Sequence, residues 1–247
     1  MVHSSWLPFS GFAGTPADMV EGLRRAVTSD GLIVMPSMTY HNQSSREFLE
    51  GEGVMKVRRS PSRMGLLTEV FRRSAGVRRS LSPTHPLLAW GDRAEWFLAG
   101  HEDALEPFGA SSPFARLLEL DAKILCVDAP FSTITYTHFL EDRIAETLPF
   151  PLYEPEPLAG TVLDYEGQER EVPVKVLNRV ANQMRREERL VKELDERGVI
   201  QRARVGNTRL LLVGARAMAD AVDEMTAQGR GFFDAPVGPA REARDGR

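Results

Sequence analysis

The sequence has 247 residues, enough to bury a substantial core as one large domain or two small ones. Hydrophobic residues make up 42% and charged residues 27%, a balance that excludes fibrous and low-complexity proteins. No stretch approaches the roughly 18 consecutive apolar residues of a membrane span, and the N-terminus lacks the basic and apolar regions of a signal peptide. Because Cys126 is the single cysteine, no internal disulfide can form, and we expect a cytoplasmic protein.

Charge is distributed unevenly along the chain, although the net charge is only −4. Residues 56–79 carry eight basic residues against Glu69, whereas residues 141–171 carry nine acidic residues against Arg143 and Arg170. Such blocks either solubilise a surface or bind a ligand of opposite charge, and both interpretations stay open. The acidic remainder and the lack of aromatic residues within the basic block disfavour nucleic-acid binding.

The first half of the sequence predicts helices that alternate with short buried strands. Thr15 and Pro16 are typical of an N-cap and a first helical residue, and the expected helix extends to about Ser29. Residues 36–62 are rich in Ser, Gly and charge, so we expect a long loop with at most one helical turn. The other expected elements are strands at 32–35, 87–89 and 124–127 and helices at 64–73, 92–97 and 112–120.

The second half predicts two hairpins and two helices. One hairpin pairs residues 161–165 with 169–176, and the other pairs residues 200–205 with 208–213 around Gly206-Asn207. We expect a charged helix at 178–197, a last helix at 215–228 and a disordered tail at 236–247. The mixture of buried strands, helices and hairpins predicts a single α/β domain over residues 1–235, built as a sandwich around a mixed sheet.

The segment from Ser132 to Asp142 carries the most informative pattern. It follows the apolar strand at 124–127, and Ser132 or Thr133 is expected to cap a new helix. On such a helix Thr135, His138 and Glu141 share one face, because three-residue spacing brings side chains together. A hydroxyl, an imidazole and a carboxylate beyond the end of a strand suit a ligand site of an α/β fold. The alternative interpretation is a structural histidine paired with its own glutamate.

A series of short motifs in a fixed order resembles the aminoglycoside 3-N-acetyltransferase family, the antibiotic acetyltransferases that do not have the GNAT fold. The resemblance covers nearly the whole chain and is densest from 61 to 141. Its motifs are Val2-His3-Ser4-Ser5, Gly31–Pro36, Pro61–Gly65, Phe71-Arg72-Arg73, Arg79-Ser80, Pro83-Thr84-His85, Ala89-Trp90-Gly91, His101-Glu102, Ser112-Pro113 and Thr135–Glu141.

This resemblance implies the mixed-sheet α/β/α sandwich of that family and transfer of an acetyl group from acetyl-CoA to a primary amine of an amino sugar. It makes His138 the general base, because a protonated amine must lose its proton before it can attack. Thr135 is expected to stabilise the oxyanion of the thioester. Glu141 is expected to help hold the imidazole and, with Asp142, to bind the cationic acceptor. The expected CoA-binding residues are His3, Ser4, Ser5, Arg79 and Ser80.

The sequence departs from the family pattern at its start and at four loop positions. Only Met1 and Val2 precede His3, so the usual N-terminal helix and strand are expected to be absent. A histidine, a serine, a glycine and an aspartate of the usual pattern are replaced, respectively, by Ser82, Pro86, Asp128 and Phe131. These replacements lie close to the expected CoA and acceptor sites.

Two other functions remain open beside the acetyltransferase. One is a non-catalytic or truncated relative that binds CoA or an amino sugar without turnover. The other is a metal-assisted hydrolase that uses His138 and Glu141, although two ligands are too few and the remaining histidines are too scattered for a zinc site, so we expect no metal. His85 is expected to brace a proline-rich turn and His101 to lie near a helix end or in a surface loop. The oligomeric state stays open.

Overall fold

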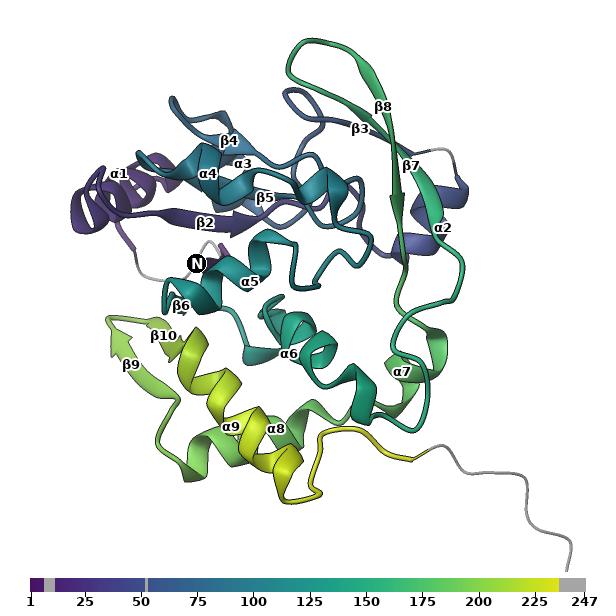
Figure 1. Ribbon diagram of the computed structural model, residues 1–247. Helices are drawn as coiled ribbons and strands as arrows, with labels where there is room; N and C mark the ends of the chain where they lie inside the picture. The colour runs from purple at the N-terminus through teal and green to yellow at the C-terminus, as the bar shows by residue number, and fades with distance from the viewer. Residues whose placement is uncertain (7–11, 52, 236–247) are drawn as a thin grey trace, which may run out of the picture.

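The computed structural model describes residues 1–6, 12–51 and 53–235, so the tail expected at 236–247 lies outside the described residues. Figure 1 shows the arrangement of the elements. The α-helices are α1 (Pro16–Val27), α2 (Ser45–Glu50), α3 (Leu66–Arg73), α4 (Ala94–Leu98), α5 (Pro113–Glu119), α6 (Thr137–Arg143), α7 (Arg179–Met184), α8 (Glu187–Glu196) and α9 (Ala215–Ala227). The strands are β1 (Val2–Ser4), β2 (Ile33–Pro36), β3 (Val54–Lys56), β4 (Arg78–Arg79), β5 (Leu87–Trp90), β6 (Lys123–Val127), β7 (Leu158–Leu163), β8 (Glu169–Val174), β9 (Gln201–Val205) and β10 (Thr208–Gly214).

The described strands form a four-stranded sheet and two three-stranded sheets. The first has the order β1-β6-β10-β9, in which β1 runs parallel to β6 and β10 is antiparallel to both of its neighbours. The first sheet is therefore mixed. The others have the orders β2-β5-β4 and β3-β7-β8. The third sheet is mixed as well, because β3 is parallel to β7 and β8 is antiparallel to it. The α/β class is confirmed, although the strands are divided among several sheets.

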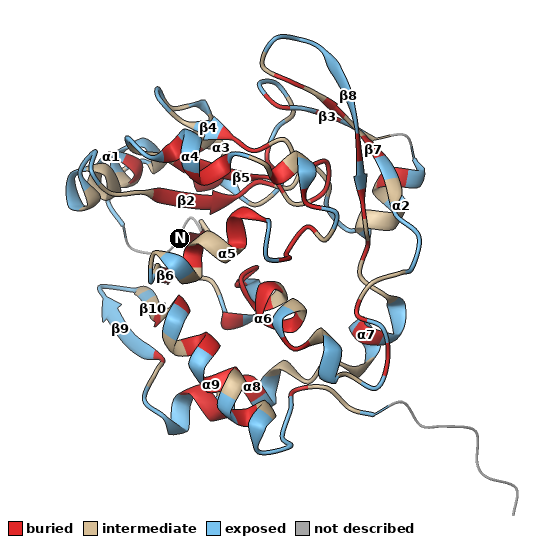
Figure 2. Cartoon of the chain, viewed as in Figure 1, coloured by how far each residue is buried: buried red, intermediate tan, exposed pale blue. Residues whose placement is uncertain are grey.

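Side-chain alternation along β2 explains the sandwich. Ile33 and Met35 are buried in a cluster with residues of α1 and α3, whereas Val34 is buried in the main core on the other face. That main core is formed chiefly by β6, β10, α5, α6, α8 and α9. Figure 2 shows buried residues on the facing sides of these elements and exposed residues on their outer sides. Strands are therefore covered by helices on both faces, as in the expected α/β/α sandwich.

Several local predictions are confirmed because short-range chemistry determines them. Thr15 caps α1 in a reciprocal capping box with Asp18. Both hairpins form: β7 pairs with β8, and β9 pairs with β10 through a turn in which Gly206 has a φ of 59°. The sheet also has a strand, β1, which includes His3 and Ser4, and the absence of the usual helix and strand before this segment stays a prediction. A single domain over residues 1–235 stays a prediction.

Two regions differ from the sequence-based prediction. The helix expected at 178–197 is wrong as one element, because Arg185 takes an extended backbone (φ −63°, ψ 132°) and separates α7 from α8. The loop expected at 36–62 contains α2 and the strand β3. β3 pairs with β7 more than a hundred residues later in the sequence, and no local pattern predicts such a partner.

His101 was expected near a helix end or in a surface loop, and it lies in a short 3-10 helix but is buried in the core. Its Nδ1 is 2.8 Å from the hydroxyl of Ser80, and its Nε2 is 3.3 Å from the carbonyl oxygen of Pro107. Burial lowers the pKa of His101 to about 4. His3 in β1 is also buried, and burial together with the nearby N-terminal amine lowers its pKa to about 3. Both imidazoles are neutral in the native protein at neutral pH.

These two histidines predict a loss of stability in mild acid. The unfolded chain binds a proton at each histidine near pH 6.5, whereas the native protein does so only near pH 4 or 3, so the free energy of unfolding falls as the pH is lowered from about 6.5. Each histidine contributes at most about 1.4 kcal/mol per pH unit. Urea denaturation at pH 7 and pH 5 measures the effect, and His101→Gln should lose less stability between the two pH values than the wild-type protein. Equal losses would contradict this account.

Candidate active site

A cavity of about 580 Å³ lies beside the carboxyl ends of β1 and β6. Because these two strands are parallel neighbours, the segments that follow them leave the sheet at the same edge. Ligand sites of α/β folds form at such edges. The lining residues are His3, Ser4, Ser5, Trp6, Pro36, Met38, His41, Arg63, Met64, Gly65, Leu66, Thr68, His85, Ser132, Thr133, Ile134, Thr135 and His138.

His138 occupies the first turn of α6 and lines this cavity. The helix expected to start at Ser132 or Thr133 begins later, because those residues form a 3-10 turn and Ile134 after it is extended. The backbone N–H of His138 donates to the carbonyl oxygen of Thr135 at 3.2 Å, so the two residues stay adjacent at the cavity wall. The expected juxtaposition of Thr135 and His138 is therefore present without a continuous helix.

Glu141 lies behind His138, away from solvent. Its Oε2 is 2.9 Å from Nδ1 of His138, and since a carboxylate only accepts, the proton of this hydrogen bond is on Nδ1. Arg185 donates to both carboxylate oxygens, to Oε1 at 2.5 Å and to Oε2 at 2.7 Å. Burial alone would raise the pKa of Glu141, but the charges and hydrogen bonds of His138 and Arg185 outweigh it and hold the pKa below its usual value.

Glu141 supports the imidazole and does not line the cavity. The side chain has no exposed surface, and His138 and Arg185 occupy its oxygens. Asp142 is not brought to the cavity either: its Oδ1 accepts a hydrogen bond of 2.8 Å from Tyr153, and burial raises its pKa. The i,i+3 spacing predicts the contact between Glu141 and His138, and through this contact Glu141 orients the imidazole.

His3, Ser4 and Ser5 line the cavity where β1 ends, which is the place expected of a ligand-binding segment. β1 holds His3 opposite Cys126 and Ser4 opposite Val127, and the backbone N–H of Ser5 donates to the carbonyl oxygen of Val127 at 3.0 Å. The Nε2 of His3 is buried and has no hydrogen-bond partner among the residues that the structure describes.

Arg79 and Ser80 were predicted to bind CoA, and the structure places both of them away from the cavity. Both side chains are buried and neither lines the cavity. Arg79 donates to the carbonyl oxygen of Ser60 at 2.7 Å and to the hydroxyl of Ser37 at 2.7 Å, while burial lowers its pKa to about 9. Ser80 accepts a hydrogen bond from the backbone N–H of Leu87. These residues brace the loops beneath the cavity, because a buried arginine needs several acceptors.

Arg63 is the member of the basic block that reaches the cavity. Its side chain is exposed, and within the described ranges it forms no ion pair. Most of the other arginines of the block already bind groups of the protein: Arg72 and Arg73 form ion pairs with Glu69, and Arg78 forms one with Glu95. The sequence reveals the basic block, but it does not show which of its cations form ion pairs and which, like Arg63, do not.

His85 lines the cavity as a second imidazole close to His138. Both rings pack against Phe108, with ring centroids 4.5 Å and 4.8 Å away. Its Nδ1 is 3.0 Å from the hydroxyl of Thr84, and its Nε2 is 3.3 Å from that of Tyr40. Burial and the neighbouring imidazoles hold the pKa of His85 well below its usual value. The residue therefore braces its turn, as expected, and also faces the cavity, which was not expected.

An acidic groove adjoins the cavity. It has a volume of about 640 Å³ and shares Ser132 with the cavity wall. Glu187 and Glu188, at the start of α8, line it and form no ion pair in the part of the chain that the structure describes. The acidic block at 141–171 was the candidate for binding a ligand of opposite charge, and within it Glu141 is buried and Asp164 is paired with Arg170. The charge-rich start of α8 was the signal that sequence reasoning passed over.

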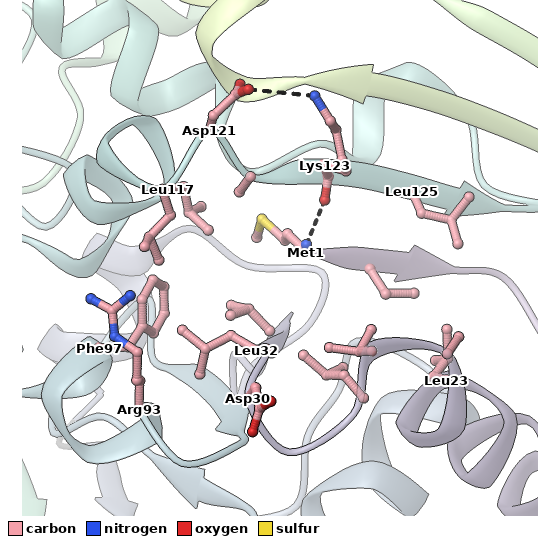
Figure 3. A pocket seen from close by; sticks show the side chains of 18 of the residues that line it. Met1, Leu23, Asp30, Leu32, Arg93, Phe97, Leu117, Asp121, Lys123 and Leu125 are labelled. Atoms are coloured by element: carbon pink, nitrogen blue, oxygen red, sulfur yellow. Dashed lines mark hydrogen bonds and ion pairs between the residues drawn. The ribbon is translucent and has the colours of Figure 1, made fainter.

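A second cavity, of about 510 Å³, lies near the amino-terminal ends of β1 and β6, where α1, β2 and α5 contribute to its wall (Figure 3). Its wall is mainly apolar and includes Leu23, Leu32, Phe97 and Leu117. None of the predicted site residues lines it. The described residues include no group of three His, Cys, Asp or Glu side chains that could hold a metal ion. Within the same residues, every helix is too short or too polar to cross a membrane.

Comparisons with known sequences agree on one family. The family model for aminoglycoside 3-N-acetyltransferase matches residues 1–227. The SPbeta prophage-derived aminoglycoside N(3')-acetyltransferase-like protein YokD of Bacillus subtilis (strain 168) is 28% identical over 160 residues, which cover 58% of this chain and 58% of that protein. Aminoglycoside N(3)-acetyltransferase III of Salmonella sp is 30% identical over 153 residues, 57% of this chain and 53% of that protein. The chain spans little more than half the length of these curated relatives.

Solved structures share the fold. The binary complex of AAC-IIIb with CoASH has a TM-score of 0.73 at 22% identity, covering 94% of this chain and 91% of that one. The YokD protein from Bacillus subtilis has a TM-score of 0.71 at 23% identity, covering 91% and 85%. AAC-VIa bound to sisomicin has a TM-score of 0.70 at 23% identity, covering 92% and 91%. Since the family model matches most of the sequence and the fold agrees, the chain belongs to the aminoglycoside 3-N-acetyltransferase family.

Proposed function

We propose that this protein transfers the acetyl group of acetyl-CoA to a primary amine of an aminoglycoside or a related amino sugar, with His138 as the general base. The observation that carries the proposal is the His138–Glu141 pair at the wall of a cavity that His3, Ser4 and Ser5 also line. Membership of the family supports it, as do relatives whose names include the acetyltransferase activity. We also propose a cytoplasmic location, since a reduced Cys126 suits that compartment.

The hydrogen-bond pattern supports Nε2 of His138 as the base atom. The Nδ1–H of His138 is donated to Glu141, so Nε2 keeps the lone pair that accepts a proton from the attacking amine. The amine nitrogen forms a bond to the thioester carbonyl carbon, and the carbonyl oxygen becomes an oxyanion. The C–S bond then breaks, and the proton on Nε2 passes to the departing CoA sulfur. The Thr135 hydroxyl at the cavity wall is proposed to donate to the oxyanion.

The two sides of His138 are proposed to bind the two substrates. The cavity has room for the pantetheine arm, and the free cation Arg63 replaces Arg79 as the proposed partner of a CoA phosphate. The neighbouring groove offers Glu187 and Glu188 to the ammonium groups of the acceptor. Ser132 lines both, so the two substrates would meet close to His138. A metal has no part in this proposal.

Acetyl-CoA should raise the melting temperature of the purified protein, because a ligand that binds the native state stabilises it. The rise should shrink with added salt, since phosphate electrostatics supply part of the affinity. Arg63→Ala should weaken acetyl-CoA binding by about 10-fold, the loss expected for one charge-assisted hydrogen bond. The matched control is Arg59→Ala, which removes an exposed arginine of the same block that does not line the cavity. Calorimetric titration measures both affinities, and equal losses would remove Arg63 from the proposal.

Glu187→Gln should raise KM for a polycationic aminoglycoside by roughly 5-fold to 10-fold and leave KM for acetyl-CoA nearly unchanged, because the variant loses one carboxylate–ammonium contact. The control is Glu146→Gln, an exposed acid within the acidic block that lines neither the cavity nor the groove. Steady-state kinetics with both substrates varied separates the two KM values. If the two variants behave alike, the groove is only a solvated surface.

His138→Asn should lower kcat by roughly 10²-fold to 10⁴-fold and leave the affinity for acetyl-CoA nearly unchanged, because an amide keeps the polar shape but cannot accept the proton. A structural role for His138 predicts the reverse, a lower melting temperature with normal turnover. Measuring both quantities on one preparation decides between them. A wild-type protein that binds acetyl-CoA and aminoglycoside but transfers nothing would indicate the non-catalytic alternative.

A further inference from the structure

Arg185 lies at an interruption between two helices, in a conformation that local sequence does not favour. The apolar pattern would carry one helix through residues 178–197, yet the backbone is extended at Arg185 and forms an isolated bridge with Phe233. The guanidinium also donates through Nη1 to the side-chain oxygen of Asn182 at 3.1 Å. The extended residue directs its side chain at Glu141, 44 positions earlier in the sequence.

The contact between Arg185 and Glu141 is a two-point one. Nε and Nη2 of the guanidinium bind separate oxygens of the carboxylate, and one of these oxygens also binds Nδ1 of His138. Glu141 has no exposed surface, so the guanidinium and the imidazole, and not solvent, satisfy its oxygens. A lysine could supply the charge but not the planar pair of donors.

The charges of this cluster balance only while Arg185 is present. A buried carboxylate without a cation takes up a proton, or makes its imidazole partner take one up, because an unpaired charge is costly to bury. The other ionisable groups nearby do not replace the cation: Glu187 on α8 and Asp142 on α6 are acidic, and Tyr153 and His85 are neutral. Removing Arg185 would leave the His138–Glu141 pair with a net negative charge in a dry environment.

We infer that Arg185 is a positioning residue for the proposed transfer: it neutralises Glu141 and fixes its orientation, so that the imidazole of His138 is held with Nε2 free for the substrate amine. The inference deepens the proposed function and rests on it. Arg185 acts through Glu141 and does not touch the reacting atoms.

The test follows protonation of His138 without requiring turnover. Diethyl pyrocarbonate modifies only the unprotonated imidazole, and mass spectrometry measures the rate at His138 as a function of pH. In Arg185→Met the midpoint of this curve should move upward by about 1 pH unit or more, because the pair binds a proton more readily once the cation is lost. The acidic limb of the kcat/KM profile should move by the same amount. Arg185→Lys should move both by less.

The matched control is Arg186→Met, which removes the adjacent arginine of the same linker and its ion pair with Asp234. Its midpoint should equal that of the wild-type protein. The double variant Glu141→Gln/Arg185→Met removes both charges together, so its midpoint should return toward the wild-type value. If Arg185→Met does not fold, Arg185→Lys becomes the test, and a midpoint in that variant equal to the Arg186→Met control would overturn the inference.

A midpoint in Arg185→Met that equals the control, with only a lower melting temperature, would overturn the inference and leave Arg185 as a purely structural residue. A midpoint in the double variant that stays as high as in the single variant would overturn it as well. If the wild-type protein modifies normally at His138 but transfers no acetyl group, the proposed function fails, whereas a shifted midpoint in Arg185→Met still supports the link from Arg185 to His138.

Discussion

The buried carboxylate of Glu141 is the interaction on which the site depends. One carboxylate with no exposed surface is shared between the imidazole of α6 and the guanidinium that follows α7. A charge in such a place persists only when its partners are fixed, because no water compensates for a lost contact. The backbone accommodates this requirement: the helix that the sequence would continue is interrupted at Arg185, so two elements far apart in the sequence are held together at His138.

The electrostatic division of the surface follows from this arrangement. The cavity beside His138 is lined by histidines, hydroxyls and the cation of Arg63, and the neighbouring groove, which shares Ser132 with it, includes the carboxylates of Glu187 and Glu188. The two hollows therefore differ in the charge that they present.

Much of the fold was predictable because the signals were local. Capping at Thr15, the turn at Gly206 and the apolar runs of β2 and β6 each depend on a few neighbouring residues, and all are present. The His138–Glu141 contact was predictable for the same reason, since three-residue spacing brings the pair together. β3 and Arg185 depend on partners far away in the sequence. The burial of Arg79 was not predictable, because composition shows that an arginine is present but not whether it is buried.

The segment that follows α9 is synthesised late, and the support of His138 depends on it. Phe233 forms the bridge that keeps Arg185 extended, and Asp234 binds the neighbouring Arg186 and Arg189. Both residues leave the ribosome long after His138, because they lie close to the end of the described chain. A nascent chain that has already built β6 and α6 would still lack the contact that orders the linker between α7 and α8. The imidazole would therefore acquire its support late, after most of the core around it has been made.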